Sequence, residues 1–83
     1  MGNVILVYKV LPKDPKNLRD AKRELEGLGA ERIEEEPIGF GITALKVTLI
    51  VPDEGGVQDN VEEKLSKLGS IQSFELLRYG RVL

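Results

Sequence analysis

The sequence has no cysteine and no histidine among its 83 residues. Without cysteine there is no disulfide framework of the kind that stabilises small secreted domains. Without either residue the chain also lacks thiol nucleophiles, the usual general base near neutral pH and the common zinc ligands. Its serines, at positions 66, 70 and 73, therefore have no histidine partner for nucleophilic catalysis. We expect a protein that is not an enzyme and that holds no cofactor or metal of its own.

Long apolar runs and an excess of positive charge are missing too. No stretch approaches the roughly 20 apolar residues of a membrane span, because charged residues such as Lys46 and Asp53 interrupt each run. The first residues lack the basic and apolar regions of a signal peptide. With 12 basic and 14 acidic residues, the chain has no basic surplus to neutralise nucleic-acid phosphates. These absences predict a cytoplasmic protein that binds neither membranes nor nucleic acid directly.

The first half of the chain predicts a strand, a helix and a second strand. Residues 4–11 are mostly β-branched and apolar, which favours a strand. Asp14 suits a helix cap and Pro15 suits the first helical position. Apolar residues then recur at helical spacing, which predicts a helix: Leu18, Ala21, Leu25 and Leu28. Gly27 and Gly29 favour the C-terminus of this helix.

The second half repeats this pattern. A strand over about residues 30–37 and another ending at Val51 are joined by Gly39-Phe40-Gly41, which predicts a hairpin. Three successive glutamates, 34–36, are typical of an edge strand. A helical stripe of Val57, Val61, Leu65 and Leu68 follows and ends at Gly69. We expect a last strand over residues 70–79 and a short tail over 80–83.

The element order strand-helix-strand-strand-helix-strand predicts the fold class. It is typical of the α+β, ferredoxin-like βαββαβ fold, in which two helices cover one face of a four-stranded antiparallel sheet. No linker or change of composition divides the chain, so residues 1–83 are expected to form a single domain and, on its own, a monomer.

Two features are candidates for a binding role. Phe40 is one of only two phenylalanines and stands between Gly39 and Gly41 at the predicted hairpin tip. It is interpreted either as a cover for the open end of the core or as an anchor that enters a partner's pocket, as aromatic hot spots do. Arg78 and Arg81 near the end of the chain are interpreted either as solvated charges of a frayed terminus or as a cationic probe beside the sheet.

The central part of the chain resembles a known family. The block Pro-Ile-Gly-Phe-Gly-Ile at 37–42, the opening Tyr-Lys-Val at 8–10 and the turn Val-Pro-Asp-Glu-Gly-Gly at 51–56 resemble translation elongation factor 1-beta of the archaeal type. They are also similar to the C-terminal domain of the eukaryotic exchange subunit. The likeness covers nearly the whole chain, and its most specific part is the central block.

This resemblance implies a role in protein biosynthesis. It implies guanine nucleotide exchange, in which GDP is released from the GTPase elongation factor 1-alpha; the GDP and its magnesium belong to that partner. In the family the phenylalanine of the Gly-Phe-Gly block docks into a pocket on the GTPase, and Phe40 stands at that position. A basic residue near the family's C-terminus reaches toward the metal and phosphate site. Eukaryotic relatives have a lysine just before the last residue; here that residue is Val82, and Arg81 aligns with the lysine.

Two other functions fit the same topology. An RNA-binding module would also carry a Gly-Phe-Gly fragment, but it stacks bases on strand aromatics, and residues 43–51 have none. A regulatory domain would bind a ligand or pair with itself through the polar sheet face or an edge strand. Salt-dependent RNA titration and light scattering at several concentrations distinguish these alternatives from exchange activity.

Overall fold

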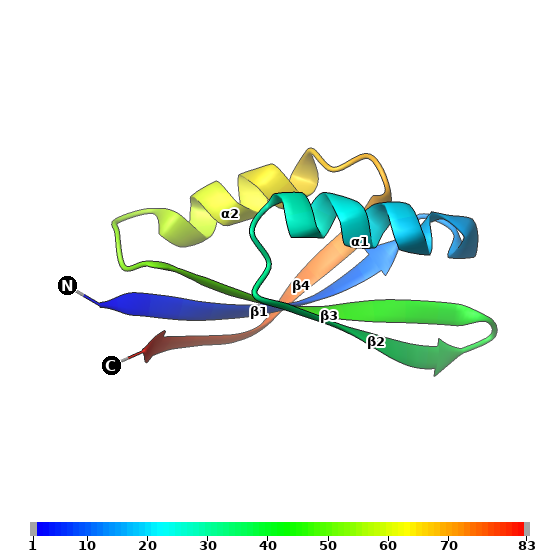
Figure 1. Ribbon diagram of the computed structural model, residues 1–83, viewed down its shortest axis with the longest axis horizontal. Coiled ribbons are helices and arrows are strands. Elements are labelled where there is room, and N and C mark those ends of the chain that lie inside the picture. Colours follow the sequence, from blue (N-terminus) through cyan, green and yellow to red (C-terminus); the bar gives the residue numbers. More distant parts are fainter. Residues whose placement is uncertain (1, 83) are drawn as a thin grey trace.

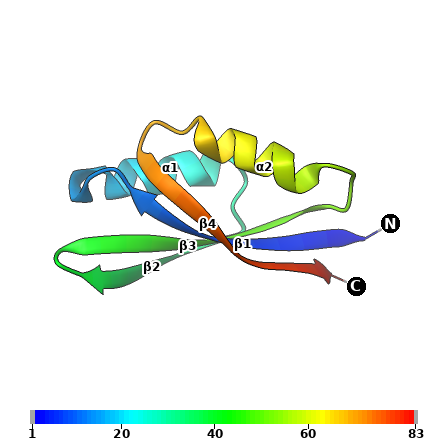
Figure 2. The same ribbon diagram turned by 180° about the vertical axis from the view of Figure 1, so that it is seen from behind.

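The computed structural model describes residues 2–82 and contains one antiparallel sheet and two α-helices. The elements are β1 (Asn3–Pro12), the short 3-10 helix η1 (Pro15–Asn17), α1 (Leu18–Gly27), β2 (Arg32–Gly39), β3 (Ile42–Pro52), α2 (Val57–Ser66) and β4 (Ile71–Val82). The strand order is β2-β3-β1-β4, and both helices lie on one face of the sheet (Figure 1, and from behind in Figure 2). The predicted ferredoxin-like fold is confirmed, and the acidic residues 34–36 lie on an edge strand as expected.

The core lies between the sheet and the helices. Alternate residues of the central strands face the helices, as the period of a strand requires. Leu6, Tyr8 and Val10 of β1 are fully buried, and they lie opposite Leu49, Val47 and Leu45 of β3. The helices add Ala21, Leu25, Val61 and Leu65 to the same buried cluster. Each fully buried leucine or valine stabilises the fold by about 1.5–3 kcal/mol. The buried residues of the two helices therefore hold the helices on the sheet.

The first helix begins in two steps. The Asp14 side chain accepts a hydrogen bond from the Lys16 backbone N–H at 2.9 Å. The Asn17 N–H donates to the Asp14 carbonyl at 2.8 Å, which closes a tight 3-10 turn. Asp14 and Pro15 thus mark the start of η1, and α1 begins only at Leu18. The second strand likewise begins later than predicted, at Arg32, and continues to Gly39.

The last strand is longer than the sequence predicted. The expected tail over residues 80–83 is wrong for residues 80–82, because β4 continues to Val82; Leu83 lies outside the described residues. Gly80 is opposite Ile5 and Arg81 is opposite Val4, both on β1. The tail is ordered as a strand because β1 begins at Asn3 and offers it backbone partners. That long-range pairing is not visible in the local sequence.

A buried tyrosine links the sheet to α2. The Tyr8 hydroxyl donates to the Glu62 carboxylate at 3.1 Å, and the Gln58 amide donates to the same oxygen at 3.0 Å. The Tyr8 ring meets Phe74 edge to face, with ring centroids 5.9 Å apart. Burial, followed by the hydrogen bond to Glu62, raises the pKa of the Tyr8 hydroxyl above its ordinary value.

Removing this hydroxyl is expected to lower stability and to change its pH dependence. Tyr8→Phe loses one hydrogen bond, so the free energy of unfolding should fall by about 1 kcal/mol near neutral pH. Because the folded pKa is raised, the unfolded chain releases the proton first. The contribution of Tyr8 is therefore complete below about pH 10 and is lost as the pH rises above it. Denaturant titrations followed by circular dichroism should show a steeper loss above about pH 10 for the wild type than for Tyr8→Phe, and equal slopes would contradict this assignment.

Candidate partner-binding surfaces

The tip of the β2–β3 hairpin has an unusual backbone. Gly39, Phe40 and Gly41 all have positive φ angles, of 107°, 55° and 74°. Glycine adopts such angles readily, but a residue with a Cβ pays roughly 1–2 kcal/mol in the left-handed region. Phe40 is the one non-glycine residue with positive φ in the described part of the chain. The hairpin predicted from Gly-Phe-Gly is confirmed, and its central residue is strained.

The Phe40 side chain projects fully into solvent. Its exposed fraction is 101%, so the interpretation that it covers the open end of the core is wrong. The ring therefore contributes no packing in the free protein, while its backbone conformation is unfavourable. Strained backbone persists mainly at functional positions. The arrangement suits a residue whose contacts are made in a complex, where burial of a phenylalanine gains about 1.5–3 kcal/mol.

Two isoleucines beside Phe40 extend this surface, and neither was predicted from the sequence as a contact residue. Ile38 and Ile42 have exposed fractions of 46% and 43%. Together with Phe40 they form the apolar tip, defined as Ile38, Phe40 and Ile42. Adjacent exposed apolar side chains are typical of an interaction site. The sequence carried a signal for this surface, because Ile38, Phe40 and Ile42 alternate with two glycines. Three large apolar residues at the tip of a hairpin have no core to pack against.

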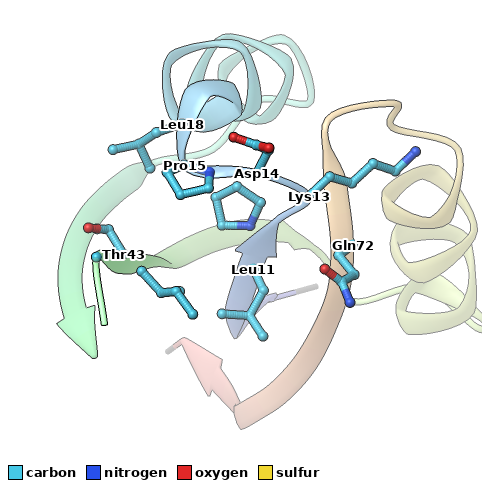
Figure 3. A pocket seen from close by; sticks show the side chains of 10 residues that line it. Leu11, Lys13, Asp14, Pro15, Leu18, Thr43 and Gln72 are labelled. Carbon is cyan, nitrogen blue, oxygen red and sulfur yellow. The ribbon is translucent and has the colours of Figure 1, made fainter. Parts of the chain in front are cut away.

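A hollow of about 360 Å³ includes Ile42 of the apolar tip in its lining, and Figure 3 shows other side chains that line it. Gly41 and Ile42 line it on the β3 side, and the end of β1, the start of α1 and the start of β4 complete it. Its walls are largely apolar, with Leu11, Pro15 and Leu18 among them (Figure 3). Its one carboxylate, Asp14, already caps η1. The hollow thus enlarges the apolar surface at this end of the molecule.

The two arginines predicted to act near the C-terminus lie on opposite faces of the sheet. Arg81 is opposite Val4, a fully buried residue on the helix-covered face. Arg78 is opposite Val7, whose side chain points to the other face because side chains alternate along β1. The interpretation of a frayed terminus is wrong for both, since both lie in β4. The Arg81 side chain is nonetheless 72% exposed, and its Nε lies 3.6 Å from Oδ2 of Asp53.

The predicted site residues form two groups far apart. The β2–β3 tip lies at one end of the longest dimension of the molecule, and the C-terminal end of β4 lies at the other (Figure 1). That dimension is 42 Å. The structure thus brings Gly39, Phe40 and Gly41 together and places Arg81 at the far end. Any partner that contacts both groups must present two separate surfaces.

Other kinds of site find little support in the described residues. Residues 2–82 contain no group of three or more acidic side chains placed to hold a metal ion. Within the same range, no helix has the length and apolar character needed to cross a membrane. The central strands β1 and β3 carry one aromatic residue, Tyr8, and it is fully buried beneath the helices. The open sheet face therefore lacks the central-strand aromatics on which RNA-recognition modules stack bases.

Comparison with known proteins gives a consistent result. The profile of the EF-1 guanine nucleotide exchange domain matches residues 5–82. Elongation factor 1-beta of Methanoculleus marisnigri is 39% identical over 79 residues, which cover 93% of this chain and 94% of the relative. Elongation factor 1-beta of Methanosphaera stadtmanae is 40% identical over an alignment of 88 positions that spans both chains completely. The protein of the same name from Methanothermobacter thermautotrophicus is 35% identical, again over both full lengths.

Proposed function

Because the chain belongs to the family of EF-1 guanine nucleotide exchange domains, we propose that it promotes release of GDP from the translation GTPase elongation factor 1-alpha. The whole chain, residues 1–83, acts as one exchange domain. It works by protein–protein contact and breaks no bond itself, and the GDP and magnesium belong to the partner. The observation that supports this most strongly is Phe40, fully exposed on a strained hairpin tip.

Exchange by this route is a matter of linked binding equilibria. Suppose that an exchange protein binds the nucleotide-free GTPase more tightly than the GDP-bound form. It then weakens GDP binding by the ratio of those two affinities, because the coupling between two ligands is reciprocal. The factor must therefore make contacts that exist only when the nucleotide site is open. The continuous sheet that joins the two ends of this molecule suits such contacts, since it sets their separation.

The apolar tip supplies the first contact. Phe40 enters a pocket on the GTPase, and Ile38 and Ile42 pack around the entrance. The positive φ angles of Gly39 and Gly41 hold the ring away from the sheet, and the small glycines let the partner's backbone approach closely. This contact supplies affinity, because a buried aromatic side chain at the centre of an interface carries a large share of its binding energy.

Arg81 supplies the second contact, at the other end of the molecule. Its guanidinium is always charged and is largely exposed. Placed near the partner's phosphate site, it competes with magnesium for the same negative charge and so favours loss of the metal and the nucleotide. Arg78, also predicted as a contact residue, lies on the opposite sheet face. We assign the cationic contact to Arg81 because it is the residue that aligns with the lysine of the eukaryotic relatives.

Calorimetric binding measurements test this proposal. The chain is titrated into elongation factor 1-alpha that is nucleotide-free and, separately, loaded with GDP and magnesium. We expect the Kd for the nucleotide-free form to be at least about tenfold lower, which is the coupling of about 1.4 kcal/mol that useful exchange requires. Equal affinity for the two forms would contradict the proposal, because such a factor cannot shift the GDP equilibrium.

A further inference from the structure

We propose that Asp53 is a positioning residue for Arg81, an inference that rests on the exchange function proposed above. Asp53 directly follows β3, and its Oδ2 lies 3.6 Å from the Arg81 Nε. Since β1 lies between β3 and β4, this ion pair spans β1 on the helix-covered face. The β1 residue opposite Arg81 is Val4, which is fully buried. The pair thus links the two strands on either side of β1 at the end of the sheet.

Asp53 is the fixed member of this pair. Its backbone N–H donates to the Gly2 carbonyl at 3.1 Å, and the next N–H, of Glu54, donates to the Pro52 carbonyl at 2.9 Å. The Asp53 side chain is only 30% exposed, whereas that of Arg81 is 72% exposed. A carboxylate on a backbone held in this way provides a defined position against which the long arginine side chain can be oriented.

The chemistry of the contact suits positioning. Arginine has five N–H donors, and a contact through Nε leaves the four on the terminal nitrogens for a partner. A side chain that is already restricted loses less conformational freedom when it binds. The pair is exposed and is not bidentate, so it is weak and does not hold Arg81 against a stronger partner. Asp53 therefore orients the guanidinium without withholding it.

A double-mutant cycle measures this role. In GDP-release assays with elongation factor 1-alpha, Asp53→Ala should lower the maximal rate of GDP release, the quantity that depends on Arg81, by about two- to threefold, the value of a typical exposed ion pair. In the Arg81→Ala background the same change should have no further effect. Glu54→Ala removes the neighbouring carboxylate of the same loop and serves as the matched control, with no change expected.

A second readout does not depend on the GTPase. In NMR relaxation measurements on the free chain, the Arg81 Nε–H group should show restricted motion, should become freely mobile in Asp53→Ala, and should become restricted again in Asp53→Glu. The inference is wrong if Asp53→Ala leaves the rate of GDP release unchanged or raises it. It is also wrong if Asp53→Ala lowers that rate by the same factor in the wild-type and Arg81→Ala backgrounds. Either result leaves the exchange function standing. A wild-type chain in which Arg81 shows restricted motion but which never accelerates GDP release removes the exchange function, and with it this role for Asp53.

Discussion

Replacing Phe40 by alanine is expected to slow GDP release from elongation factor 1-alpha by about 30-fold or more at sub-saturating concentrations of the chain. Truncation of a central aromatic hot spot costs about 2–4 kcal/mol of binding energy, and every 1.4 kcal/mol is about tenfold. The ring is fully exposed in the free protein, so the loss falls on the complex and not on the fold. Stopped-flow fluorescence with a labelled GDP analogue measures the rate.

Two further variants separate binding from stability. Phe40→Gly removes the same ring and also relieves the positive φ angle, so its free energy of unfolding should rise by up to about 1 kcal/mol while exchange is lost. Leu77→Ala truncates another exposed apolar side chain, on β4, and should retain exchange. A Phe40→Ala chain as active as the wild type, or an equal loss in Leu77→Ala, would contradict the role of the apolar tip.

Replacing Arg81 by alanine is expected to lower the maximal rate of GDP release by about tenfold. A charged group facing phosphates gains about 1.5–3 kcal/mol from charge-assisted hydrogen bonds, and the lower end of that range corresponds to this factor. Arg81→Lys should recover part of the rate, since the charge remains but the planar donor group is lost. The difference between wild type and Arg81→Ala should shrink as salt is added, because exposed charges are screened.

Arg78→Ala is the matched control for this prediction. It removes the same charge from the same strand three residues earlier, so it changes the net charge of the chain equally, but its side chain faces the other side of the sheet. We expect less than about a twofold change, as for a surface charge outside the contact. If both alanine variants lose the same activity, the effect is one of overall charge and the assignment to Arg81 is wrong.

The fold could be predicted from the sequence because its signals are local and repeated. Apolar residues at helical spacing, such as Leu18 and Leu25, and alternate apolar residues in β3 decide which faces are buried. The ends of the helices and strands were harder to predict from the sequence. The extension of β4 to Val82 depends on pairing with the first residues of β1. A prediction that placed the last strand's end at Tyr79 could not assign Arg81 to a face.

The candidate site could be located only in part. The Gly-Phe-Gly pattern and the family resemblance pointed to Phe40, but the residues alone left open whether the ring faces the core or solvent. That choice depends on the backbone angles of the turn and on whether a neighbouring element covers it. Likewise, the contact between Asp53 and Arg81 joins two segments on either side of β1, and no local pattern indicates it.

The most direct test of the proposed exchange function is the rate of GDP release itself. Elongation factor 1-alpha loaded with a fluorescent GDP analogue is mixed with excess unlabelled nucleotide and increasing concentrations of the wild-type chain. We predict a release rate that rises with concentration, saturates and exceeds the spontaneous rate at every concentration used. A rate that stays at the spontaneous value across the whole range would contradict the account, whatever the chain binds.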